Sequence, residues 1–109
     1  SSPTTPLIST PTTGKVTFKI SGEPFKFLLD GKEAPELRVK QGDTVRIEFT
    51  NTKGFHDLVV DEFSAKTQQL SAGSAETIEF VADKKGTFEY HCSVGNHRAM
   101  GMKGNLIVE

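Results

Sequence analysis

The sequence predicts an all-β fold, an eight-stranded Greek-key β-sandwich, on three observations. From Lys15 onward, apolar and polar residues alternate with a period of two, as they do on strands that bury one face. Turn-forming residues separate these segments at fairly regular spacing, which is typical of sandwiches and small barrels. No stretch of ten residues has a helical period.

The first half of the chain contains four of the predicted strands. Residues 15–20 (KVTFKI) alternate Val, Phe and Ile with Lys and Thr. Residues 24–33 form a second strand segment with a turn at Asp30-Gly31. Residues 35–51 form two more strands, divided by a Gln-Gly-Asp turn at 41–43.

The second half contains the other strands. Residues 55–63 (FHDLVVDEF) predict a short strand, and residues 74–83 and 86–92 show clear alternation. Residues 104–109 close the domain with alternate apolar side chains pointing inward. The segment 61–74 is the least regular and has room for a short helical turn.

Composition narrows the classes of function. The 13 basic and 14 acidic residues nearly cancel, so neither nucleic acid nor an anionic membrane is expected as the main partner. No apolar run approaches the length of a membrane span. A single cysteine excludes an internal disulfide framework.

The N-terminal segment differs in composition from the rest. Ser, Thr or Pro occupies 11 of the first 14 positions, which predicts a flexible tether over residues 1–14 and one domain over residues 15–109. The alternative is an incidental end of the chain. The segment lacks the basic and apolar regions of a signal peptide. Because a tether suits an exported protein held near a membrane surface, we expect export with the signal peptide removed.

All of the sulfur lies within residues 90–104 (YHCSVGNHRAMGMKG). Cys92, His97 and Met102 follow one another at intervals of five. A thiolate and imidazoles in a trigonal set, with a long weak thioether bond, form the ligand arrangement of blue copper sites. The spacing therefore predicts a copper site, which needs a second histidine.

Two histidines remain as candidates for that ligand. His91 adjoins Cys92 on one strand, so its side chain points to the opposite, outer face. His56 lies at the loop end of a distant strand and completes the predicted set of His56, Cys92, His97 and Met102. Met100 is the rival to Met102, although Gly101 gives the backbone freedom to turn Met102 toward the metal. The same His2Cys set also suits zinc.

Four segments in this order resemble the cupredoxins, the plastocyanin/azurin family of blue copper proteins: GDTVRIEFTN, FHDLVVDEF, ETIEFVADKKGTFEYHC and HRAMGMKGNLIVE. The resemblance covers residues 15–109. It implies one type 1 copper ion held by the four residues named above, and the shuttling of single electrons by Cu(I)/Cu(II) cycling. The protein is then no enzyme; the alternatives are a copper carrier or storage module, or a mononuclear copper site acting on a small molecule such as nitric oxide.

The resemblance also implies a monomer with transient redox protein partners and a location outside the cytoplasm, in the periplasm or on the outer face of the membrane. The ring edge of His97 would be the electron port, within an apolar rim of Val94, Ala99, Met100 and Phe55. Three basic residues would lie near this end and favour an acidic partner: Lys53, Arg98 and Lys103.

Three further expectations follow from the resemblance. Asp57 would link the His56 loop to the Cys92 loop. Gly95-Asn96 stands where similar proteins often have Pro-Gly, which adds a backbone N–H able to reach the thiolate. An exposed His91 would occupy a position resembling the second electron-entry site of plastocyanins.

Overall fold

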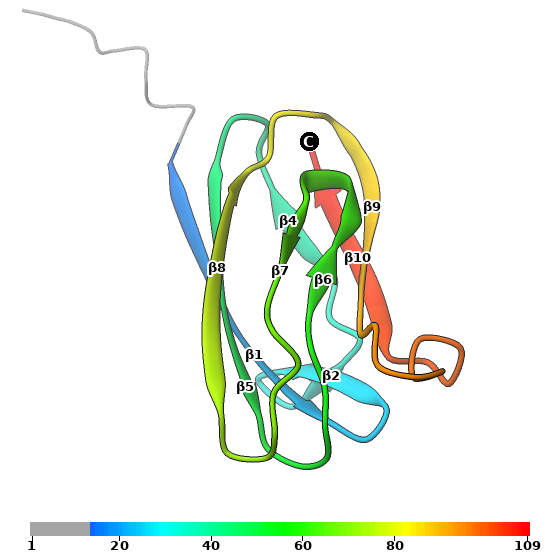
Figure 1. The fold of residues 1–109 in the computed structure, drawn as a ribbon. Helices are drawn as coiled ribbons and strands as arrows, with labels where there is room; N and C mark the ends of the chain where they lie inside the picture. Colours follow the sequence, from blue (N-terminus) through cyan, green and yellow to red (C-terminus); the bar gives the residue numbers. More distant parts are fainter. Residues whose placement is uncertain (1–13) are drawn as a thin grey trace, which may run out of the picture.

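The computed structural model describes residues 14–109 and confirms the predicted β-sandwich. Ten strands form two five-stranded sheets packed face to face (Figure 1). Residues 14–109 contain no α-helix, only one turn of 3-10 helix, η2 (Asp61–Phe63), and so no helix of this part is long and apolar enough to cross a membrane. The predicted tether lies outside the described residues except for Gly14.

The first sheet holds, in spatial order, β3 (Lys32–Glu33), β2 (Lys26–Leu29), β1 (Lys15–Glu23), β5 (Thr44–Asn51) and β8 (Ala75–Val81). Strands β1 and β5 run parallel, whereas β5 and β8 run antiparallel. Strands adjacent in this sheet are therefore often distant in sequence.

The second sheet holds, in spatial order, β4 (Leu37–Val39), β10 (Lys103–Val108), β9 (Gly86–His91), β6 (Val59–Val60) and β7 (Ala65–Lys66). Strand β10 is parallel to β4 and antiparallel to β9. The chain thus passes between the sheets several times, as the predicted Greek-key connections require.

The number of strands is ten rather than the predicted eight, because one predicted strand divides in two and the irregular segment adds a short one. Residues 24–33 form the hairpin β2–β3, since Asp30 and Gly31 both have positive φ angles, 51° and 83°, as a tight two-residue hairpin turn needs. The irregular segment 61–74 supplies η2 and the short strand β7.

The core lies between the sheets and consists of the inward-pointing residues of the alternating strands. Val45, Ile47 and Phe49 of β5 are fully buried. Phe27 of the first sheet contacts Tyr90 of the second edge to face, with ring centroids 5.3 Å apart. This packing fixes the two sheets against each other and leaves the loops to the ends of the sandwich.

One end of the sandwich gathers three connections from different parts of the chain (Figure 1). The β1–β2 turn, the loop after β5 and the loop between β9 and β10 all lie at the end away from the C-terminus. The predicted ligand residues lie in or next to the last two.

Candidate metal centre

Three of the four predicted ligand residues meet at this end of the sandwich. Nδ1 of His56 lies 3.2 Å from Nδ1 of His97, and the sulfur of Cys92 lies 3.9 Å from the first and 3.6 Å from the second. His56 and Cys92 are buried, and His97 is partly exposed. Within residues 14–109 no other group of histidine, cysteine or carboxylate side chains converges in this way.

The spacing of these donor atoms fits a single metal ion. Two imidazole nitrogens and a thiolate bound about 2.0–2.3 Å from one ion lie roughly 3.2–3.8 Å from one another. Two of the three separations, 3.2 and 3.6 Å, lie within this range, and the third, 3.9 Å, lies just above it. A donor set of one soft sulfur and two imidazoles suits copper and zinc.

His56 is held by the strand framework. Its backbone N–H donates to the carbonyl of Leu70 at 3.2 Å, and the Leu70 N–H donates back at 2.8 Å. The buried amide of Asn51 donates to the carbonyls of Gly54 and Leu70, both at 2.7 Å. At Gly54, with φ of 81°, an added Cβ would lie 2.8 Å from Nε2 of His56, so glycine lets the ring fit.

Cys92 follows β9, and the loop after it is tied to the His56 loop. The buried carboxylate of Asp57 accepts hydrogen bonds from the Ser93 N–H at 2.6 Å and from the Ser93 hydroxyl. The predicted link through Asp57 is therefore confirmed as a contact. Asp57 follows His56, and Ser93 follows Cys92, so this contact joins the two loops that carry predicted ligands.

The two buried residues of the predicted ligand set, His56 and Cys92, have shifted pKa values. Burial raises the pKa of the Cys92 thiol, while hydrogen bonds from the Asp57 and Val94 backbone act in the opposite direction. Burial, and then the charge of His97, lower the pKa of His56, which favours the neutral imidazole that binds metals. The backbone groups acting on the sulfur thus come from Asp57 and Val94 rather than from Gly95, where the missing proline led us to expect an added N–H.

His97 lies on the loop of residues 92–102, which contains no strand. Its N–H donates to the Val94 carbonyl at 3.0 Å, and its carbonyl accepts from Met100 at 3.0 Å and from Met102 at 3.1 Å. Gly95 and Gly101 have φ angles of 52° and 106°. The loop is therefore a series of tight turns held by hydrogen bonds within itself.

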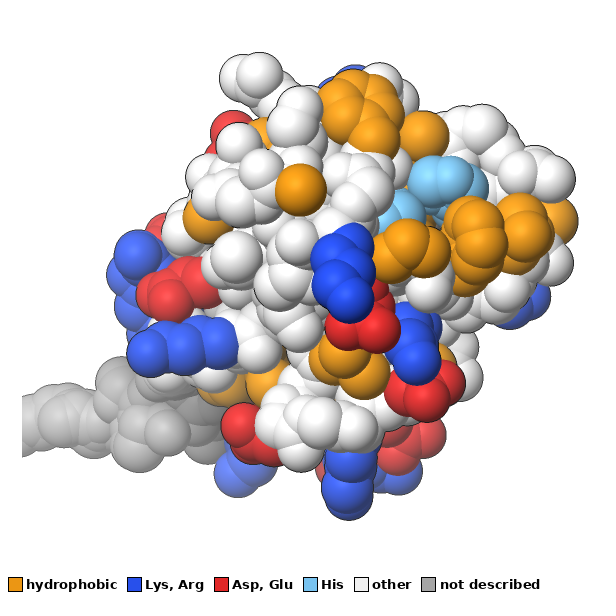
Figure 2. All heavy atoms as spheres, turned by 90° about the horizontal axis from the view of Figure 1, so that it is seen from below, with side chains coloured by type: hydrophobic (Ala, Val, Ile, Leu, Met, Phe, Trp, Pro, Cys, Tyr) orange, Lys and Arg blue, Asp and Glu red, His pale blue; other side chains and the backbone are white. Residues whose placement is uncertain are grey.

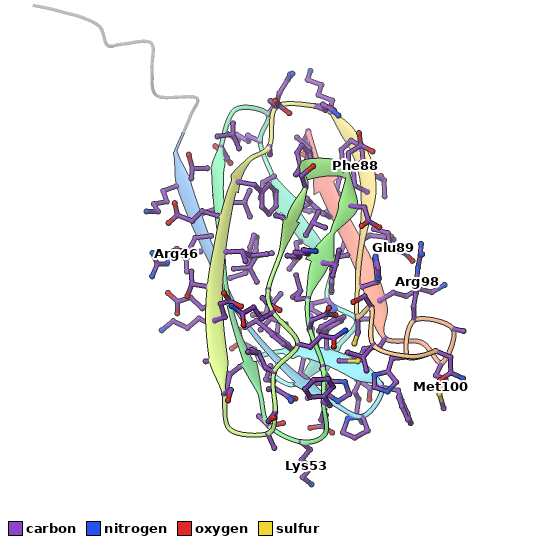
Figure 3. The ribbon with its side chains drawn as sticks, viewed as in Figure 1. Arg46, Lys53, Phe88, Glu89, Arg98 and Met100 are labelled. Atoms are coloured by element: carbon purple, nitrogen blue, oxygen red, sulfur yellow. The ribbon has the colours of Figure 1, made fainter. Side chains whose placement is uncertain are left out.

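The two methionines have opposite environments. Met102 is fully buried, and its carbonyl accepts the Cys92 N–H at 3.1 Å. Met100 is 50% exposed and lies at the outer edge of the β9–β10 loop (Figure 3). Of the two rivals, Met102 is the one whose backbone is next to Cys92.

The exposure predicted for His91 is wrong. Its side chain does point away from Cys92, but it is only 7% exposed, and its Nε2 lies 2.9 Å from Oδ2 of Asp61. The 3-10 turn η2 begins at Asp61 and packs against β9, covering this part of the outer face. His91 thus lacks the exposed ring expected of a second electron-entry site.

The surface around His97 is mainly apolar. Figure 2 shows hydrophobic side chains gathered around the histidine rings at this end. Exposed Phe55 and Met100 agree with the predicted rim, and Phe25 adds a residue that the sequence analysis missed. The one sequence signal for Phe25 was Pro24 before it, which marks a turn.

The positive charge expected at this end is partly neutralised. Arg98 pairs with Glu89 on β9, and Figure 3 shows both side chains beside that strand. Lys53 lies at the tip of the loop after β5 (Figure 3). Only part of the predicted basic character therefore remains near His97.

Comparisons with known proteins agree with this fold. The sequence model of a family described as cupredoxin-like domain matches residues 12–108. A copper-containing nitrite reductase of Neisseria gonorrhoeae is 34% identical over 84 residues, 67% of this chain and 21% of that protein. The chain spans about a fifth of the length of the first curated relatives it matches.

Two solved structures are similar over most of their length. Auracyanin of Roseiflexus castenholzii, reduced with sodium dithionite, is 28% identical with a TM-score of 0.68, covering 90% of this chain and 97% of that one. Rusticyanin of Thiobacillus ferrooxidans is 27% identical with a TM-score of 0.74, covering 90% of this chain and 82% of that one.

Proposed function

The chain belongs to the cupredoxin-like domain family, and on this premise we propose that it is a blue copper protein that passes single electrons between redox partners. The observation that carries the proposal is the convergence of His56 Nδ1, His97 Nδ1 and Cys92 Sγ within 3.9 Å of one another. Auracyanin, a similar protein of which the match covers 97%, has a crystal structure in a dithionite-reduced form.

We propose His56, Cys92, His97 and Met102 as the ligands of one copper ion. The burial of Met102 beside Cys92 supports it as the weak fourth ligand over exposed Met100. Copper would supply the one-electron Cu(I)/Cu(II) couple, for which a mixed sulfur and imidazole set is suited. The framework around His56 would keep the donor positions nearly unchanged between the two states.

An electron carrier is favoured over an enzyme by the supply of ligands. The whole sequence has three histidines, of which two belong to the proposed site. The third, His91, has Nε2 against Asp61, and its Nδ1 is buried without a partner among the described residues. Residues 14–109 therefore offer no ligands for a second copper centre. A copper enzyme that catalyses a reaction at a separate centre would need one.

The exposed apolar side chains around His97 support brief contacts with redox proteins, which need fast release more than affinity.

We propose that the protein works as a monomer and outside the cytoplasm. The Ser, Thr and Pro-rich residues 1–14 support the second point, because their composition suits a tether. Sedimentation of the full chain and fractionation of the cells that make it test both points.

The decisive experiment is a visible spectrum of the purified protein during titration with Cu(II), before and after ascorbate. We expect an intense blue to green absorption that ascorbate bleaches and that Cys92→Ser lacks, because the colour arises from the thiolate–copper bond. A colourless wild-type protein would refute the proposal. Repeated redox cycling without loss of copper would separate an electron carrier from a copper store.

The matched pair Met102→Leu and Met100→Leu tests the fourth ligand. Loss of a weak sulfur donor destabilises Cu(II) more than Cu(I), so Met102→Leu should raise the reduction potential and change the hue. Met100→Leu should leave both unchanged. The reverse result would assign the fourth position to Met100.

A further inference from the structure

The β1–β2 turn, residues 22–26, lies against three segments that carry proposed ligands. The ring of Phe25 contacts the ring of His97 edge to face, with centroids 5.1 Å apart and planes at 69°. A Cβ built on Gly54, two residues before His56, would lie 3.5 Å from Cγ of Pro24. One turn of the first sheet thus forms a wall of the site.

Met102 approaches the same turn. A Cβ built on Gly22 would lie 3.4 Å from the methyl carbon of Met102. It would also lie 2.7 Å from Cζ of Phe49, so glycine is what lets the core pack this closely to β1. The turn therefore touches the fourth proposed ligand as well as His97.

Phe25 has a backbone conformation that large side chains rarely adopt. Its φ angle is 84°, in the left-handed region, and its N–H donates to the Glu23 carbonyl at 2.8 Å, which closes a tight turn around Pro24. The other non-glycine residues with positive φ in the described chain have small side chains: Asp30, Ala34 and Ser64. Strain of this kind persists where the surrounding structure uses it, often at functional sites.

The ring of His97 is close to two other rings. Its centroid lies 4.9 Å from that of His56 and 5.1 Å from that of Phe25. No strand carries His97, so the sheets do not set the direction of its ring. Phe25, which lies between β1 and β2 of the first sheet, contacts the His97 ring and so connects this loop to that sheet.

We propose that Phe25 is a positioning residue for His97. Its ring, presented by the strained turn, keeps the imidazole directed with Nδ1 toward Cys92 and His56 and keeps small anions away from that flank of the metal site. This rests on the proposed copper site. A purely structural role for Phe25 would instead affect only the stability of the fold.

The test compares Phe25→Leu and Phe25→Gly with two matched controls. Phe55→Leu makes the same change in an exposed phenylalanine at the same end, and Ser64→Gly relieves a positive φ far from the site. The first readout is the NMR signal of the His97 ring in the metal-free protein. The second is azide affinity of the Cu(II)-loaded protein, followed by absorption.

We expect the His97 ring signal to broaden by exchange in both Phe25 variants and to stay sharp in wild type and both controls. Azide should bind the two Phe25 variants about 10-fold more tightly, the scale on which the surroundings of a metal site act. Phe25→Gly relieves the φ strain, but it also loses the buried part of the ring and adds freedom to the unfolded chain, so the metal-free variant should stay folded and unfold at or somewhat below the temperature of wild type.

An unchanged His97 signal in both Phe25 variants would overturn the proposal, and so would variants that merely lose their fold. Broadening without tighter azide binding would keep the positioning role and overturn the exclusion of anions. A wild-type protein that shows no thiolate–copper colour would refute the proposed function, and the metal-free NMR result would still decide the role of Phe25.

Discussion

The two histidines of the proposed site differ in how the protein holds them. His56 is 1% exposed, is bridged to Leu70 by two backbone hydrogen bonds and lies above the buried amide of Asn51. His97 is partly exposed and lies on a loop whose turns are closed by hydrogen bonds between its own backbone groups. One imidazole thus belongs to the scaffold, and the other belongs to a loop that holds its shape by its own hydrogen bonds.

This difference raises the question of which contacts hold the loop of residues 92–102 in place. Its first residues are tied down by Asp57, which binds Ser93, and its last by the hydrogen bond between Cys92 and Met102. His97 lies between these fixed points, and its ring contacts Phe25 of the first sheet as well as His56. The proposed copper site, if built this way, would keep His56, Cys92 and Met102 in place while presenting His97 at the surface.

The largest loss of stability should come from removing the link between the His56 loop and the Cys92 loop. Asp57→Ala removes a buried acceptor of two hydrogen bonds and leaves the Ser93 N–H without its partner. Hydrogen bonds to charged groups contribute about 1.5–3 kcal/mol each, so the free energy of unfolding should fall by about 3 kcal/mol. Urea unfolding of the metal-free wild type and variant measures this fall in the free energy of unfolding.

Ser93→Ala is the control for this variant, because it removes the hydroxyl bond and keeps the backbone one. Its loss should be about half as large. If Asp57→Ala changed neither stability nor copper retention, the link would have no role in holding the two loops together.

We expect a smaller loss of stability from substituting one glycine on each side of the site, Gly54 beside His56 and Gly95 in the His97 loop. Gly54→Ala places a methyl group 2.8 Å from Nε2 of His56, whereas Gly95→Ala meets no described atom within 4 Å. Both residues have positive φ, which costs alanine about 1 kcal/mol. We expect a loss of about 1 kcal/mol for Gly95→Ala and about 2 kcal/mol or more for Gly54→Ala, because overpacking adds its own cost.

Thermal unfolding compares the two alanine variants directly. Copper release to a chelator should quicken in Gly54→Ala and stay close to wild type in Gly95→Ala. Equal losses at both positions would contradict the view that the His56 side is the rigid one.

The smallest effect should come from the surface of the loop. Arg98→Ala breaks the exposed pair with Glu89, and such pairs contribute about 0.2–1 kcal/mol. We expect a decrease in unfolding free energy of less than about 1 kcal/mol, and less still at high salt. A larger loss, insensitive to salt, would show that Arg98 holds the loop through something other than this ion pair.

His91 shows the limit of prediction from alternation. The period of two correctly placed its side chain opposite Cys92, because successive residues of β9 point to opposite faces. Whether that outer face met water depended on η2, which comes from a segment about 30 positions away and covers it. No local pattern in residues 86–92 carries that information.

The chain's own pattern of residues determined the strands, the sandwich and the gathering of sulfur near one loop, because alternation and turn residues act locally. Only the tertiary structure decided which methionine is buried, which rings flank His97 and that Phe25 reaches the site from the other sheet. These contacts join residues far apart in sequence, and their geometry depends on how the two sheets pack.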